Sequence, residues 1–238
     1  MSDAAIVAEG LGVRFLFDRH RRPVTPALAR LRRRGEERWG LRDVGFRAGP
    51  GEGIALVGPS GAGKTTLLRA IAGILPADRG VLRVGGRVTT LLSIDAGLLS
   101  PLTGAENAEL LGVLDGRSVR AARAQAGAVR RATGLGEEFG RPVASWSQGM
   151  RARLGLALAE QGAPAILLLD EVHEALDHEF RAVLEEHARA LLAAGGIIVA
   201  AGHDHPMLER ICERGLLLRD GAIAADGSFA AVREAYVG

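Results

Sequence analysis

The chain has 238 residues, of which 47% are hydrophobic, and this is enough to fill the core of one large domain or two small ones. Its net charge of +2 argues against a chain that acts over its whole length as a nucleic-acid-binding polycation. The single cysteine, Cys212, excludes an internal disulfide, and no apolar run approaches the roughly 20 residues that span a bilayer.

The first sixty residues predict three strands. Ile6–Phe17 alternates as a strand does, and an interruption over 18–40, with prolines and a basic run, predicts a loop with a short helix. Leu41–Phe46 returns to the strand pattern, and Gly53–Val57 is apolar throughout, as in a buried strand.

Arginines crowd the first forty residues, against few acids. Such a cluster predicts a basic surface that faces anionic lipid headgroups or an acidic partner. A solvated insertion in an arginine-biased chain is an equally open alternative. The residues are Arg14, Arg19, Arg21, Arg22, Arg30, Arg32, Arg33, Arg34 and Arg38.

Further along the chain, strands alternate with helices, which predicts an α/β core with a parallel sheet. Gly85-Gly86 and Asp220-Gly221 are hairpin signals between short strands. The pattern over 103–134 is helical, and the stretch of about 95–160 interrupts the alternation like an inserted helical subdomain. The expected helices are Leu67–Ala72, Leu154–Glu160, Phe180–Ala194 and Ser228–Tyr236, and the expected strands Val81–Val84, Val88–Leu92, Ile166–Leu169, Ile197–Ala201, Leu216–Arg219 and Ala222–Ala225.

Lys64 is the only lysine among the 30 basic residues, and it lies in a G-x-x-x-x-G-K-T pattern typical of a nucleotide phosphate-binding loop. A compact ammonium on a flexible stem reaches between the β- and γ-phosphates, where the planar fork of arginine is too bulky. The glycines let backbone N–H groups point at phosphate, and the next helix adds its N-terminus. A glycine-rich turn that merely contains lysine is the alternative. The candidate ATP-binding residues are Gly58, Pro59, Ser60, Gly61, Ala62, Gly63, Lys64, Thr65, whose hydroxyl is placed for Mg²⁺, and Thr66, placed for the α-phosphate.

Two carboxylates follow the apolar run Ile166–Leu169. A buried strand delivers Asp170 to the end of the sheet, where it can hold the Mg²⁺ water shell. Glu171 can polarise a water for attack on the γ-phosphate. Two acids that cap a strand at the solvent boundary are the alternative, which the phosphate loop upstream disfavours.

Two further segments are informative because of their positions, one at the start of a helix and one after a buried strand. Ser147 is a good N-cap, and the helix start at Ser147-Gln148-Gly149 exposes amides that can bind phosphate. His203 follows a buried strand, where it can hydrogen-bond the γ-phosphate and orient Glu171. Surface histidines in a turn are the alternative for His203 and His205, and a metal site is disfavoured because no cysteine or third histidine is nearby.

In this order, the segments resemble the ATPase subunits of ABC transporters over essentially the whole chain. The loop at 58–66 is similar to Walker A, 147–151 to the signature motif, 166–171 to Walker B, and Ala175-Leu176-Asp177 to the D-loop. The resemblance makes His203 the switch histidine and implies a head-to-tail homodimer with an ATP between Walker A of one subunit and Ser147–Gly149 of the other. Phe15 is then the first candidate to stack on adenine, and Phe17 the alternative.

A narrower resemblance is to the branch that exports O-antigen, capsule, teichoic acid or related glycans. It rests on the basic insertion before Trp39–Val44, on the signature form Ser147–Gly155 and on the ending at 224–236. This branch works with a separate polytopic membrane permease and exports lipid-linked glycan at the cost of ATP.

The chain departs from the ABC pattern in the segment that usually carries a glutamine. Leu91–Gly97 has none, as is frequent in polysaccharide exporters, and Ser93 or Asp95 is left to link Mg²⁺ to the membrane partner. The signature reads Trp-Ser-Gln-Gly-Met, and His203 follows glycine rather than serine. None of these changes removes a group needed for hydrolysis.

The resemblance implies an α/β fold: a P-loop NTPase core of ABC ATPase type with an antiparallel β part and an inserted helical subdomain. The core is expected over 1–94 and 161–238 and the subdomain over 95–160. The expected function is an ATPase at the cytoplasmic face of the membrane, attached through its permease, that powers polysaccharide export with ATP and Mg²⁺. No nucleic-acid partner is expected. The alternatives are export of a lipid, drug or peptide, a non-transport ABC protein, and a module that binds ATP without hydrolysing it.

Overall fold

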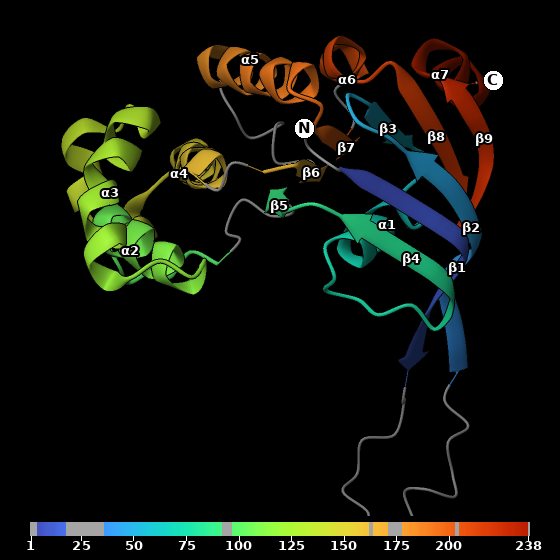
Figure 1. Ribbon diagram of the computed structural model, residues 1–238, viewed down its shortest axis with the longest axis horizontal. Coiled ribbons are helices and arrows are strands. Elements are labelled where there is room, and N and C mark those ends of the chain that lie inside the picture. The colour runs from blue at the N-terminus through green and yellow to red at the C-terminus, as the bar shows by residue number, and fades with distance from the viewer. Residues whose placement is uncertain are drawn as a thin grey trace, which may run out of the picture.

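Two β-sheets and a group of helices make up the fold (Figure 1). The computed structural model describes residues 4–17, 36–91, 97–161, 164–170, 178–202 and 205–237. No helix in these ranges combines the length and apolar character needed to cross a membrane.

A three-stranded antiparallel sheet has the order β2-β1-β4, with strands β1 Ala5–Phe17, β2 Glu36–Ala48 and β4 Arg79–Gly85. One face carries buried side chains, among them Ile6, Leu11 and Leu41, and the other face is turned to solvent. This is the usual division in an antiparallel sheet that packs on a core with one side only.

A second sheet has six strands in the order β5-β6-β7-β3-β8-β9. All neighbours pair in parallel except β8 and β9, which form a hairpin. Strands β3, β6 and β7 are buried along their whole length, which explains their unbroken apolar runs. The strands are β3 Gly53–Val57, β5 Val88–Leu91, β6 Ile166–Asp170, β7 Ile197–Ala201, β8 Arg214–Arg219 and β9 Ala222–Ser228.

Alternate residues of this sheet enter two different cores. Ile54 and Leu56 pack toward α1 and the antiparallel sheet, whereas Ala55 and Val57 join the cluster of the helices on the other face. Cys212 lies in that second cluster, and burial raises the pKa of its thiol far above the usual range. The helices of the two layers are α1 Lys64–Ile71, α5 His178–Ala193, α6 His205–Ile211 and α7 Phe229–Val237.

The remaining helices form a separate group with its own small core (Figure 1). They are α2 Gly104–Leu114, α3 Val119–Thr133 and α4 Gln148–Gln161, with 3-10 turns at Gly136–Gly140 and Val143–Ser145. Phe139, Trp146 and Leu154 lie at the centre of this core. The division of the chain at 95 and 160 stays a prediction.

The hairpin expected at Gly85-Gly86 is wrong. Strand β4 pairs with β1 in the antiparallel sheet, whereas β5 pairs with β6 in the parallel sheet, so the chain crosses from one sheet to the other at this point. Gly86 has a φ of 101°, and an added Cβ would lie 2.8 Å from the Ala165 Cβ. Glycine at this position therefore permits the chain to cross closely from one sheet to the other, rather than forming a two-residue turn. The hairpin expected at Asp220-Gly221 is confirmed.

Other elements also differ from expectation. Strand β2 begins at Glu36, so the expected loop does not reach Gly40, because β1 continues to Phe17 and offers a pairing partner opposite Glu36. The helical stretch of 103–134 is two helices, separated at Gly116 with a φ of 91°. Helix α6 was not expected, since it spans only seven residues.

Replacing Leu168 with alanine tests the parallel core. Leu168 is fully buried in β6, and we expect Leu168→Ala to lower the free energy of unfolding by about 2–5 kcal/mol. Leu114 is 73% exposed, so Leu114→Ala is the matched control and should change it by less than about 0.5 kcal/mol. Urea titration followed by circular dichroism measures both, and equal effects would contradict the assigned packing.

Candidate functional site

The expected phosphate-binding loop joins β3 to α1. Gly58, Gly61 and Gly63 have φ values of 145°, 80° and 107°, which only glycine adopts without strain. Helix α1 begins at Lys64, and its N-cap, Gly63, supplies no side-chain hydrogen bond. The first amides of the helix are therefore not capped by a side chain, as an anion-binding helix start requires.

Lys64 is held at the centre of this loop. Its ammonium donates hydrogen bonds to the carbonyl oxygens of Gly58 at 2.6 Å and Pro59 at 3.0 Å, and the residue is only 8% exposed. A buried ammonium needs such acceptors because burial removes its water. The arrangement keeps a positive charge inside the loop, where phosphate oxygens would be stronger acceptors than carbonyls.

Glycines from distant segments pack around the loop. A Cβ on Gly58 would lie 2.2 Å from the Leu218 carbonyl oxygen, and one on Gly63 would lie 2.6 Å from the Gly40 carbonyl oxygen. Gly221, in the β8–β9 turn, donates a backbone hydrogen bond to Ala62 at 3.0 Å. The loop is therefore fixed from two sides by backbone, and side chains at Gly58 and Gly63 are excluded.

Phe15 lies next to the loop. A Cβ added to Gly40 would be 2.5 Å from the Phe15 Cε2 atom and 3.1 Å from the Thr66 Cγ2 atom, so the ring and the first turn of α1 meet at Gly40. Phe15 is half-buried, which leaves part of the ring accessible. The Phe15 ring is therefore placed where it can stack on a planar group bound beside the loop. The side chain of Phe17, the alternative, lies outside the described residues.

Asp170 ends β6, and the parallel order β6-β7-β3 brings its strand end to the same edge of the sheet as the phosphate loop. The residue is 9% exposed. Asp170 and Gly202 are the last described residues before Glu171 and His203. Glu171, Asp177, His203 and the glutamine substitutes Ser93 and Asp95 lie outside the described residues.

The Ser147–Gly149 segment begins α4 in the helical group. The Ser147 Oγ accepts a hydrogen bond from the backbone N–H of Met150 at 3.2 Å, so the expected N-cap is confirmed. Ser147 and Gln148 are exposed. Helix α4 packs on α2, α3 and β5, whereas α1 packs on β1, β2, β6 and β7. Within one chain the structure therefore does not bring this segment to the phosphate loop (Figure 1).

Packing around α4 fixes the direction of this exposed helix start. Trp146 is 4% exposed beside Phe139, and its indole N–H has no hydrogen-bond partner among the described residues. The Arg153 guanidinium lies 3.8 Å from the centre of the Phe180 ring, which joins α4 to α5. Neither contact could be predicted from the sequence, because neither follows a local pattern.

Asn107 is a further buried residue that the sequence did not single out. It accepts a hydrogen bond from the N–H of Leu99 at 2.7 Å and donates to the carbonyls of Leu99 and Thr103. At the start of the same helix, hydrogen bonds from the Thr103 N–H and hydroxyl lower the pKa of Glu106. This capping box and Asn107 hold the chain as it enters the helical group.

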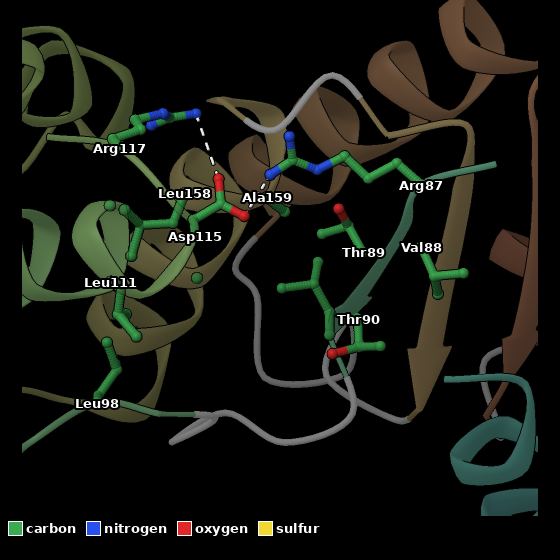
Figure 2. Close-up of a pocket in the computed structure, with 13 residues that line it drawn as sticks. Arg87, Val88, Thr89, Thr90, Leu98, Leu111, Asp115, Arg117, Leu158 and Ala159 are labelled. Carbon is green, nitrogen blue, oxygen red and sulfur yellow. Dashed lines mark hydrogen bonds and ion pairs between the residues drawn. The ribbon is translucent and has the colours of Figure 1, made fainter. Parts of the chain in front are cut away.

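A cavity of about 290 Å³ lies between edge strand β5 and the helical group (Figure 2). Apolar side chains from both sides line it, including Leu98, Leu111 and Leu158. At one end Asp115 forms ion pairs with Arg87 and, at 3.5 Å, with Arg117. Leu91 and Leu98, before and after the segment 92–96, border this cavity, and sequence periodicity could not have revealed it.

Comparison with known protein families matches residues 41–174 to the family described as ABC transporter. The O-antigen export system ATP-binding protein RfbE of Yersinia enterocolitica is 36% identical over 77% of this chain and 77% of its own. RfbB of Klebsiella pneumoniae, with the same description, is 32% identical over 85% of this chain and 82% of its own. The teichoic acids export ATP-binding protein TagH of Lactiplantibacillus plantarum is 34% identical over 74% of this chain and 48% of its own.

Solved structures support the fold. The dimeric bacterial ABC transporter cassette MJ0796 has a TM-score of 0.76 at 21% identity, over 94% of this chain and 98% of that one. A post-hydrolysis dimer of the same cassette, bound to ADP and Pi, has a TM-score of 0.77 at 20% identity and the same coverage. The expected fold class is confirmed.

Replacing Lys64 with arginine tests the geometry of the loop. Lys64→Arg keeps the charge but puts a bulky fork in a site that is 8% exposed, so we expect nucleotide affinity to fall at least ~10-fold. Titration with a fluorescent ATP analogue measures it. Arg69→Lys, an exposed change on the same helix, is the control and should bind as the wild type does. Unchanged affinity in Lys64→Arg would show that the ammonium does not contact the nucleotide.

Proposed function

This chain belongs to the ABC transporter family, and we propose that it is the ATP-hydrolysing subunit that powers export of a lipid-linked polysaccharide across the cytoplasmic membrane. The geometry of the phosphate loop carries the ATPase part of the proposal. The cargo is supported by relatives that are named for O-antigen and teichoic acid export and match most of this chain. The proposal places the chain on the cytoplasmic side, held to the membrane by a permease.

The residues present fit ATP and Mg²⁺. The loop holds a buried ammonium whose described acceptors are carbonyls, and Gly58, Gly61 and Gly63 have the positive φ values that a phosphate-binding turn of backbone amides uses. Lys64 and the loop amides would bind the phosphates, with Phe15 against the adenine. Thr65 and Asp170 would hold Mg²⁺, which offsets phosphate charge when bound.

Hydrolysis needs a base beside the γ-phosphate, and we assign it to Glu171. A water attacks the γ-phosphorus, its proton passes to the Glu171 carboxylate, and the bond to the bridging oxygen of ADP breaks, which releases ADP and phosphate. His203 positions the γ-phosphate and the attacking water. Asp170 pairs with Ala201 at the ends of the neighbouring strands β6 and β7, so the described chain leaves both strands at the same edge of the sheet, shortly before Glu171 and His203 in sequence.

The distance between the two halves of the site supports a head-to-tail dimer. Ser147, Gln148 and Gly149 begin α4, in a different part of the chain from the phosphate loop (Figure 1). A second copy would bring its exposed helix start to the ATP, where the backbone amides of Gln148 and Gly149 would contact phosphate. Asp177 would lie at the same dimer interface.

The cavity of Figure 2 is our candidate for the permease contact. It is lined by both apolar and polar side chains, it has an ion pair at one end, and it borders the segment that lacks the expected glutamine. An apolar turn or short helix with a basic or acidic end would fit these features.

Replacing Glu171 with glutamine tests the assigned base. Glu171→Gln removes the proton acceptor and keeps the size of the side chain, so we expect ATP turnover to fall ~10²–10⁴-fold while ATP binding is kept. The bound ATP should then hold the dimer together, which size-exclusion chromatography with ATP would detect. A phosphate-release assay measures turnover.

The same variant tests the cargo in the native host. Cells that carry Glu171→Gln in place of the wild type should accumulate lipid-linked glycan on the cytoplasmic side. Turnover at the wild-type rate would contradict the role of Glu171. Normal glycan export, together with lost turnover, would contradict the cargo and leave the ATPase assignment intact.

Purification from native membranes in mild detergent tests the permease contact. We expect a polytopic membrane protein to co-purify with the wild type and to be lost from Leu111→Asn, which replaces an apolar side chain of the cavity lining with a polar one. Leu114→Asn is the control on the same helix, because Leu114 is 73% exposed and does not line the cavity.

Melting temperature and ATP binding of both variants verify that the fold is intact. Co-purification of ribosomes or DNA in place of a membrane protein would overturn the export function. Retention of the membrane protein by a folded Leu111→Asn variant would move the contact to another surface.

A further inference from the structure

The solvent face of the antiparallel sheet carries a tryptophan among arginines. Trp39 on β2 pairs with Arg14 on β1, and Gly12 pairs with Arg79 on β4, so these residues share one face. A Cβ on Gly12 would lie 2.9 Å from the Trp39 Cζ3 atom, so the indole covers the strand where a side chain is missing. Trp39 is half-buried and keeps part of its ring accessible.

A hollow of about 320 Å³ opens beside this indole. The Arg79 guanidinium lies 4.8 Å from the centre of the Trp39 ring, and that of Arg14 lies 5.9 Å away. These cation–π contacts place positive charge beside the indole on the solvent face of the sheet. The lining residues are Gly10, Gly12, Trp39, Arg42, Asp43 and Arg79.

The charges around the hollow are unevenly balanced. Arg47 and Arg83 both form ion pairs with Glu9, at 2.7 and 4.0 Å. Arg42 and Arg79 form no ion pair with any residue in the described ranges, and the one carboxylate that lines the hollow belongs to Asp43. The lining of the hollow therefore carries more positive than negative charge, and an anion is the ligand that would balance it.

The same two strands lead into the most basic part of the sequence. Between the end of β1 and the start of β2, residues 18–35 contain a single acid, Asp18. The arginines of this stretch are Arg19, Arg21, Arg22, Arg30, Arg32, Arg33 and Arg34. The strands that carry the hollow are thus continuous in sequence with a strongly positive segment.

We propose that the face formed by Trp39, Arg42 and Arg79 docks directly on the phosphate headgroups of an anionic membrane. Arginine binds phosphate through paired N–H donors, and each basic residue near an anionic leaflet adds attraction. Tryptophan is favoured at the membrane–water boundary because its ring is apolar and its N–H is polar. The indole therefore lies at headgroup level while the two guanidinium groups contact phosphate.

This docking is separate from the nucleotide site and from the permease. Phe15 and Gly40 pack toward Thr66 on the inner side of the same sheet, whereas Trp39 and Arg14 lie on the outer side. A membrane on the outer face consequently leaves the phosphate loop accessible. The chain would bind vesicles that contain no permease, which the proposed function alone does not predict.

Sedimentation of the purified chain with vesicles tests this surface. We expect binding to vesicles of phosphatidylcholine with phosphatidylglycerol, little binding to phosphatidylcholine alone, and a decrease as salt is raised. The double variant Arg42→Gln/Arg79→Gln should partition about 25-fold more weakly, at roughly fivefold per arginine. Arg120→Gln/Arg131→Gln, two exposed arginines of α3, is the charge-matched control and should bind like the wild type.

Fluorescence locates the contact on the surface. Trp39 and Trp146 are the two tryptophans, and Trp146 is 4% exposed, so a blue shift of emission with anionic vesicles reports Trp39. Trp39→Phe should abolish the shift. Melting temperature and ATP binding confirm that each variant is folded.

Four results would overturn the proposal. They are no binding of the wild type to anionic vesicles, equal loss in the α3 control, undiminished binding of the Arg42/Arg79 variant, and displacement of the bound chain from vesicles by millimolar inorganic phosphate at constant ionic strength. Undiminished binding of the Arg42/Arg79 variant would assign the attraction to anionic vesicles to another basic segment of the chain. Displacement by inorganic phosphate would identify the hollow as a site for a soluble anion.

Discussion

Three glycines from distant parts of the chain meet at the phosphate loop, and the rest of the site depends on their lack of side chains. Gly63 lies in the loop, Gly40 in β2 and Gly221 in the turn after β8. A Cβ on Gly63 or Gly221 would lie 2.6 or 2.9 Å from the Gly40 carbonyl oxygen. At these distances backbone meets backbone, and no side chain can rotate away to make room. At this junction the backbone of the antiparallel sheet therefore lies directly against the phosphate loop and the β8–β9 turn.

The junction explains why an aromatic residue on the antiparallel sheet can serve a nucleotide held by the parallel sheet. Strand β1 is remote from α1 in sequence, but Gly40 brings Phe15 and Thr66 to the same point. The inner face of the sheet is committed to this contact and to the core shared with α1. Its outer face is left to solvent, and it is there that Trp39 and the arginines gather.

The sequence predicted the parts of the fold whose signals are local. The glycines and Lys64 at 58–66, and the apolar runs that became β6 and β7, depend on neighbours within a few residues, and the structure has them as expected. Gly85-Gly86 misled because a left-handed glycine has the same sequence signature in a hairpin turn and in a crossing between sheets. Only the pairing of β4 with β1 and of β5 with β6 distinguishes the two, and pairing is a long-range property.

The same limit applied to the site. Phe15 could be selected only through a family resemblance, since its nearness to Thr66 is created by the fold. The hollow at Trp39 and the cavity beside β5 combine residues from three or more segments, so no periodicity reveals them.

The helical group is joined to the core through α4, whose Ala152, Leu156 and Ala159 pack in the cluster on the parallel sheet, and this has a consequence for coupling. Its own core keeps it intact as a unit. The Arg87–Asp115 ion pair is partly exposed, at 46% and 39%, and pairs of this kind contribute about 0–1 kcal/mol. The Arg153–Phe180 contact joins α4 to α5, the helix that follows the segment containing Glu171 and Asp177. A change at the strand ends would therefore be carried to α4 through this shared cluster and the Arg153–Phe180 contact. Because α4 also lines the cavity of Figure 2, the same movement would alter the space offered to a permease, and the permease could in turn bias the position of Ser147.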